Sequence, residues 1–128
     1  MKTVRDIMSH ELVYLREGDR PSLVRRPILE LGITAVPVLD DDHRPVGVVS
    51  LRDLLEGDAD ARRTTQPATA VLDTEPIESG ARALAESGRH HLVVIDAAGK
   101  AVGMVSAIDF VRELVGLPHK HPDALSRV

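Results

Sequence analysis

Two stretches of the chain decide its fold: Val46-Gly-Val-Val-Ser-Leu-Arg-Asp53 and Val102-Gly-Met-Val-Ser-Ala-Ile-Asp109. A second pair precedes them, Gly32-Ile-Thr-Ala-Val-Pro-Val-Leu-Asp40 and Gly88-Arg-His-His-Leu-Val-Val-Ile-Asp96. One constant offset superimposes both pairs without a gap, and the glycine, serine and final aspartate of the first pair are identical. Self-similarity at a fixed spacing indicates a repeated structural unit. The chain is therefore predicted to be an internal duplication.

Each copy predicts the same order of elements: strand, helix, strand, strand, helix. Apolar runs bounded by turn residues indicate the strands, and a glycine after an amphipathic segment indicates the end of a helix. In the first copy these elements are expected at Leu12–Leu15, Ser22–Leu31, Ala35–Leu39, Val46–Val49 and Leu51–Glu56. In the second they are expected at Thr69–Leu72, Glu78–Ser87, Leu92–Ile95, Val102–Val105 and Ala107–Val115. Pro27 predicts that the first helix is kinked or starts late, because proline removes a hydrogen bond within the helix.

The predicted fold class is α+β, with two βαββα units that each hold a small three-stranded sheet and two helices. A single unit of this size would be only marginally stable alone, so the two are expected to pair about a pseudo-twofold axis and to leave two related clefts. We expect the first unit with the N-terminal segment at residues 1–57 and a linker at 58–67. The second unit is expected at 68–116 and a tail at 117–128.

Composition excludes several classes of protein. Of the 128 residues, 43% are hydrophobic and 28% charged, which is typical of a soluble globular chain. The formal net charge of −4 argues against a nucleic-acid partner, because such proteins usually present a basic face. No apolar run approaches the roughly 20 residues of a membrane span, and the first residues lack the apolar core of a secretory signal. With no cysteine for a disulfide, the expected location is the cytoplasm, without a membrane partner.

A serine and an aspartate three residues later close each repeated strand, as Ser50 with Asp53 and Ser106 with Asp109. In one interpretation they only cap the following helix, because such a pair satisfies free N–H groups in the first turn. In the other, the carboxylate accepts hydrogen bonds from both hydroxyls of a vicinal diol such as ribose. Spacing alone leaves both interpretations open.

These motifs, present twice and in the same order, resemble a tandem pair of CBS (cystathionine β-synthase) domains, also called a Bateman module. The resemblance covers Arg5 to about Val115 and implies clefts that bind AMP, ADP, ATP or S-adenosylmethionine as a regulatory ligand, with no catalytic cofactor and no metal. It also implies a homodimer and a separate effector protein as partners. By position, Ser50, Asp53, Ser106 and Asp109 would contact ribose. The residues before and at the central strand would contact adenine or phosphate: Thr34, Ala35, Val36, His90, His91 and Leu92.

The two clefts are not expected to be equivalent, because the first copy has Thr34 and Ala35 where the second has His90 and His91. The histidines are candidate phosphate ligands that become more cationic toward pH 6. Two other classes of function compete with nucleotide sensing. One is a protein–protein scaffold whose serine–aspartate pairs are only helix caps. The other is an enzyme that uses the histidine pair as an acid–base group, which is disfavoured because no nucleophile or metal cluster accompanies it.

Overall fold

The computed structural model describes residues 1–31, 35–50, 52 and 69–119. These residues form two compact units. The second-repeat unit comprises residues 1–10 and 69–119, and the first-repeat unit comprises the described residues between 11 and 52. Within the described residues, no helix combines the length and the apolar character that a membrane span needs.

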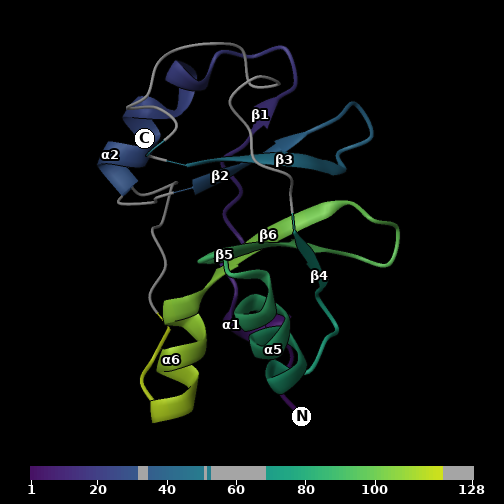
Figure 1. The fold of residues 1–128 in the computed structure, drawn as a ribbon, viewed down its shortest axis with the longest axis vertical. Coiled ribbons are helices and arrows are strands. Elements are labelled where there is room, and N and C mark those ends of the chain that lie inside the picture. The colour runs from purple at the N-terminus through teal and green to yellow at the C-terminus, as the bar shows by residue number, and fades with distance from the viewer. Residues whose placement is uncertain (32–34, 51, 53–68, 120–128) are drawn as a thin grey trace. The chain divides into compact units, whose positions relative to one another are not determined.

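The second-repeat unit is built on a three-stranded sheet with the order β4-β5-β6 (Figure 1). Its strands are β4 (Ala70–Leu72), β5 (His91–Ile95) and β6 (Ala101–Ser106), and its longer helices are α5 (Ile77–Ser87) and α6 (Ala107–Val115). Strand β4 runs parallel to β5, and β6 runs antiparallel to it. Helix α5 ends at Gly88, whose φ of 68° lies in the left-handed region that glycine adopts without strain. The predicted stop at this glycine is confirmed.

The first-repeat unit has the same topology, with the strand order β1-β2-β3. The strands are β1 (Leu15–Arg16), β2 (Ala35–Leu39) and β3 (Pro45–Ser50). The 3-10 helix η1 (Pro21–Val24) leads into α2 (Arg25–Leu31), so Pro27 falls in the first turn of the α-helix, where its missing N–H is tolerated. The late start expected from the sequence is therefore observed. Of the predicted helix Leu51–Glu56, only Arg52 lies within the described residues, and the predicted linker 58–67 lies outside them.

The two sheets share the same local irregularities, as expected of a duplication. Each central hairpin changes register at the same place, after Val38 in β2 and after Val94 in β5. In the hairpin turns, the carboxylates of Asp40 and Asp96 each accept two backbone N–H groups at 2.9 to 3.0 Å. These aspartates therefore shape the turns. The acidic run from Asp40 onward belongs to a hairpin turn.

The N-terminal segment, residues 1–10, packs within the second-repeat unit although sequence order places it before the first copy. The short helix α1 (Val4–Ile7) buries its apolar side chains in the core of that unit. The Arg5 guanidinium forms an ion pair of 2.8 Å with the carboxylate of Asp73, which is largely buried. The backbone of Ser9 pairs with that of Met104 in β6. The segment is thus a structural part of the second unit. The predicted bounds 1–57 had assigned it to the first unit.

Candidate functional site

The strand-to-helix junction of the second repeat holds the serine–aspartate pair predicted to bind ribose. Ser106 is the last residue of β6 and has extended backbone angles, so the chain leaves the sheet there and enters α6 directly. The Oδ2 atom of Asp109 accepts the backbone N–H of Ser106 at 2.8 Å. This is the capping box that the first interpretation required.

The capping role does not exclude ligand binding by Asp109. The residue is buried, with 5% of its surface exposed, although an aspartate that only caps a helix is usually solvated. A comparable box begins α1, where Oδ2 of Asp6 accepts the Thr3 N–H at 2.8 Å, and Asp6 is exposed. A carboxylate has two oxygens and about four acceptor sites, so the capping hydrogen bond does not by itself prevent contact with a ligand. Burial therefore distinguishes Asp109 from an ordinary capping aspartate.

The two predicted phosphate ligands lie next to this junction. His91 is the first residue of β5 and pairs directly with Ser106 across the β5–β6 ladder. The carbonyl oxygen of His90 accepts the N–H of Ala107, the first residue of α6, at 3.0 Å. The ladder and this bond place His90, His91 and Ser106 next to the first turn of α6, which carries Asp109.

The environment of His91 favours its neutral form. Partial burial lowers the pKa of its imidazole below the ordinary value, and the neighbouring His90 lowers the pKa further. The carboxylate of Asp109 acts in the opposite direction and raises it. Burial is the largest of the three effects, because a charged ring loses more hydration than a neutral one.

A hollow of about 350 Å³ opens beside His90, between the end of α5 and the start of α6. Its floor is apolar, and Arg89 and His90 supply its polar groups. The lining residues are Ala81, Leu84, Ala85, Gly88, Arg89, His90, Ala107 and Phe110. The sequence prediction omitted Arg89, although a basic residue directly before the histidine pair was a usable signal. Its backbone N–H donates to the Ser87 hydroxyl at 3.1 Å, which fixes the turn after α5.

The first-repeat site is only partly within the described residues. Ser50 pairs with Ala35 across the β2–β3 ladder, which is the arrangement of Ser106 with His91 in the second repeat. Thr34 and Asp53 lie outside the described residues.

Two of the predicted contact residues have side chains in the hydrophobic cores: Val36 in the first-repeat unit and Leu92 in the second. These two positions offer a ligand only their backbone groups. Among the described residues, no three His, Asp or Glu side chains are placed to hold a metal ion.

Comparison with known proteins identifies the family. The model of the CBS domain matches residues 4–60 and again residues 61–116. The chain therefore belongs to the CBS domain family and carries two consecutive copies of the domain. This confirms both the resemblance and the α+β fold class.

Among curated proteins, a UPF0053 protein of Mycoplasma pneumoniae is 30% identical over 126 residues, which cover 93% of this chain. The chain spans less than a third of the length of the curated relatives that it matches.

Two solved structures are similar over nearly the whole chain. CBSX2 of Arabidopsis thaliana, in complex with AMP, is 28% identical with a TM-score of 0.79, over 91% of this chain and 98% of that one. The CBS domain of a bacterial CNNM/CorC family Mg²⁺ transporter, in complex with an inhibitor, is 25% identical with a TM-score of 0.79. That similarity covers 93% of this chain and 79% of the other.

Proposed function

We propose that this CBS pair is a regulatory module that binds an adenosine-containing ligand and has no catalytic activity. Candidate ligands are AMP, ADP, ATP and S-adenosylmethionine. The similarity to an AMP-bound CBS pair supports the proposal. The observation that carries it within this chain is the buried carboxylate of Asp109, held at a strand end beside a histidine pair.

In the second repeat, we assign the ribose hydroxyls to Asp109 and Ser106. Hydrogen bonds to a carboxylate are charge-assisted and about twice as strong as neutral ones, so Asp109 supplies most of the affinity for the sugar. His90 and His91 are assigned to the phosphate. The backbone at Leu92 completes the site, because its side chain is in the core.

In the first repeat, the corresponding ribose ligands are Ser50 and Asp53. Thr34, Ala35 and the backbone of Val36 take the place of the histidine pair. No cation from these positions is available to a phosphate, so the first-repeat site is expected to prefer a ligand with less negative charge.

A thermal-shift panel of AMP, ADP, ATP and S-adenosylmethionine tests the proposal. A ligand at about 100 times its dissociation constant adds ~2.7 kcal/mol to the free energy of unfolding. For a domain of this size the gain corresponds to a rise in Tm of roughly 8 to 15 °C. The panel should contain at least one ligand with this effect.

The chain offers a matched control for the role of Asp109. Asp109→Ala removes a capping box together with the proposed ribose contact, whereas Asp6→Ala removes only the comparable box of α1. Both variants should lose stability, but only Asp109→Ala should lose the response to the ligand at the second repeat. If both variants respond to the ligand as the wild type does, the site assignment is wrong.

Two alternative functions make different predictions in the same experiments. A scaffold module would show no shift with any ligand of the panel. An enzyme acting through His90 or His91 would consume AMP or ATP during prolonged incubation, which mass spectrometry would detect. Either result would contradict the proposal.

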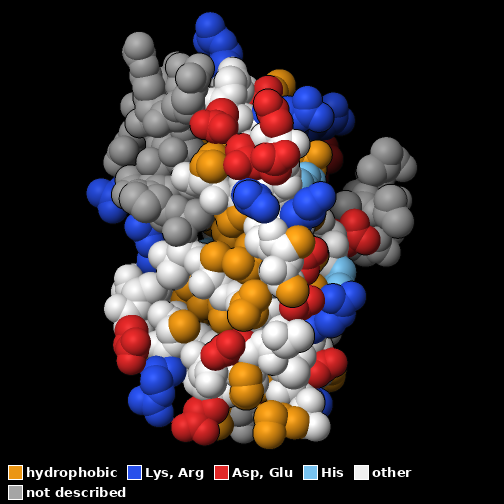
Figure 2. Space-filling view, turned by 90° about the vertical axis from the view of Figure 1, so that its right-hand side faces the viewer, with side chains coloured by type: hydrophobic (Ala, Val, Ile, Leu, Met, Phe, Trp, Pro, Cys, Tyr) orange, Lys and Arg blue, Asp and Glu red, His pale blue; other side chains and the backbone are white. Residues whose placement is uncertain are grey.

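We further propose a homodimer that forms through the helices of the second repeat. Helix α6 exposes four aliphatic side chains on one side: Ile108, Val111, Leu114 and Val115. A contiguous apolar surface such as that of α6 usually marks a protein contact. Figure 2 shows another face of the molecule, on which exposed hydrophobic side chains lie among charged ones.

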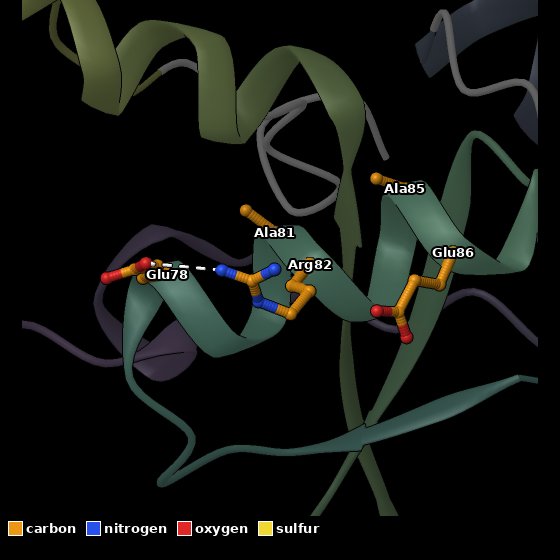
Figure 3. A pocket seen from close by; sticks show the side chains of 5 residues that line it. All are labelled: Glu78, Ala81, Arg82, Ala85 and Glu86. Carbon is orange, nitrogen blue, oxygen red and sulfur yellow. Dashed lines mark hydrogen bonds and ion pairs between the residues drawn. The ribbon is translucent and has the colours of Figure 1, made fainter.

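Helix α5 offers small residues to such a contact. A shallow hollow of about 480 Å³ lies along this helix, and Figure 3 shows two of its lining residues, Ala81 and Ala85, on the side toward α6. Arg82 and Glu78 lie along the same helix and form an exposed ion pair of 3.5 Å. Small residues let a second helix approach closely, so a large side chain of a second copy can pack there.

The test of the homodimer is sedimentation equilibrium of the wild type and of Leu114→Glu. Leu114 is 84% exposed, so the substitution should leave the folded monomer intact and should dissociate the dimer. Leu23→Glu in η1, at a side chain 63% exposed, is the matched control and should leave the dimer intact. A monomeric wild type would disprove this part of the proposal.

Occupancy of the site must change a protein contact if the module is regulatory. A ligand shifts a conformational equilibrium only by its difference in affinity for the two states. We therefore propose that the ligand-bound form is recognised by a separate effector protein.

A further inference from the structure

The histidine pair gives the second-repeat site a group that can change its charge near neutral pH. His91 is partly buried and lies opposite Ser106 in the β5–β6 ladder. Ser106 is the residue at which α6 begins, and α6 carries the buried Asp109. A half-buried imidazole is sensitive to any new charge in its surroundings, because little water is present to screen the interaction. An anion bound at this junction would therefore act strongly on its protonation.

The groups that face His91 come from each element packed against its strand. From α6, Asp109 contributes a negative charge. His90, the residue directly before β5, is exposed and lowers the pKa of His91, whereas Asp109 raises it. Strand β6 places the uncharged Ser106 beside it, and β4 contains only the aliphatic residues of Ala70–Leu72. Among the described residues, Asp109 is the acidic group that acts on His91, and no lysine or arginine occurs in the three strands β4, β5 and β6.

We propose that binding of a phosphate-bearing adenosine ligand to the second-repeat site is coupled to the uptake of a proton by His91. The inference rests on the proposed function and adds a form of regulation to that site. It makes the second repeat respond to pH as well as to ligand concentration. The first repeat has Thr34 and Ala35 at the corresponding positions and carries no such group.

The sign of the coupling follows from the charges. Without ligand, burial keeps the pKa of His91 below its ordinary value of 6.5, so the ring is neutral at pH 7. A nearby phosphate favours the imidazolium form and raises the pKa in the complex. Affinity for the ligand then increases as pH falls through the higher pKa of the complex, and it becomes constant below the lower pKa of the free protein. If the phosphate raises the pKa by about one, the affinity changes about tenfold across this window.

Isothermal titration calorimetry of the full chain with AMP tests the coupling. Titrations at pH 6.5 in two buffers with different heats of ionisation give the number of protons taken up for each AMP bound. The phosphate of AMP has a pKa near 6 and titrates by itself, so the comparison is made with a variant. His91→Ala installs the residue that the first repeat has, and His10→Ala, at an exposed histidine to which the proposal assigns no ligand contact, is the matched control.

The wild type and His10→Ala should take up more protons than His91→Ala at this pH, by a fraction of a proton for each AMP. Adenosine, which lacks the phosphate, should bind with no uptake in any of the three proteins. If AMP binds and the three proteins take up equal numbers of protons, the coupling is disproved and the nucleotide proposal stands. If none of AMP, ADP and ATP binds at any pH between 5.5 and 8, the coupling is disproved. If S-adenosylmethionine does not bind either, the proposed function is disproved with it.

Nuclear magnetic resonance decides the result if His91→Ala no longer binds AMP. The imidazole signal of His91 is assigned by its loss in that variant and is titrated in the wild type with and without AMP. A higher pKa in the presence of AMP supports the coupling. An unchanged pKa overturns it.

Discussion

Gly103→Ala tests whether the N-terminal segment is a structural part of the second-repeat unit. A Cβ atom at Gly103 would collide with the carbonyl oxygen of Ser9 and would lie 2.9 Å from the Sδ atom of Met8. The methionine side chain can turn away, but the Ser9 oxygen is a backbone atom. It is held in place because Ser9 and Met104 exchange hydrogen bonds of 2.8 and 3.2 Å.

The protein has two ways to relieve this collision, and their costs differ. If the segment detaches, Val4, Ile7 and Met8 leave the core, which loses about 1.5 to 3 kcal/mol for each side chain. If the backbone shifts locally, the cost of overpacking is about 1 to 3 kcal/mol, with about 1 kcal/mol more for the weakened hydrogen bonds. The cheaper response is the local shift. The free energy of unfolding should therefore fall by about 2 to 4 kcal/mol, which lowers Tm by roughly 6 to 22 °C.

Urea denaturation followed by circular dichroism measures this loss, since the chain has no tryptophan for fluorescence. Gly18→Ala is the matched control, because nothing lies within 4 Å of the added Cβ, and its stability should change by less than about 0.5 kcal/mol. Met8→Ala should not rescue Gly103→Ala, because the backbone oxygen causes the collision. Equal stabilities of Gly103→Ala and Gly18→Ala would refute the reasoning.

Two ion pairs give further predictions. Arg5→Met should reduce the free energy of unfolding by about 1 to 2 kcal/mol, because it removes the ion-pair partner of the buried Asp73 carboxylate. In a double-mutant cycle, adding Asp73→Asn should recover part of this loss. Hydrogen bonds from His119 and then Lys2 hold the pKa of Glu113 below its ordinary value of 4.5. The stability that this carboxylate contributes is therefore complete above pH 4.5 and is lost as pH falls through the lowered pKa. Melting curves of wild type and Glu113→Gln should differ at pH 7 and converge in acid, and a constant difference would contradict the assignment.

Local patterns in the sequence were sufficient to predict most of the fold. The repeat, the strand Ala35–Leu39 and the helix Ala107–Val115 follow from self-similarity, from apolar runs and from helix caps, all of which act between near neighbours. The first strand is the exception: the run Leu12–Leu15 predicted four residues, but only Leu15 and Arg16 form β1. Its length depends on pairing with β2, which is distant in sequence.

The sequence by itself determined the duplication, the order of the elements and the junction of serine with aspartate, because hydrophobic period and capping chemistry are properties of short segments. Only the tertiary structure decided that residues 1–10 belong to the second unit, since nothing local marks the groove that Gly103 leaves for Ser9. It also decided that the side chain of Leu92 enters the core while its neighbour His91 lies beside Asp109. Strands apolar on both faces show no alternation in sequence, so the direction of each side chain is fixed by what packs against it.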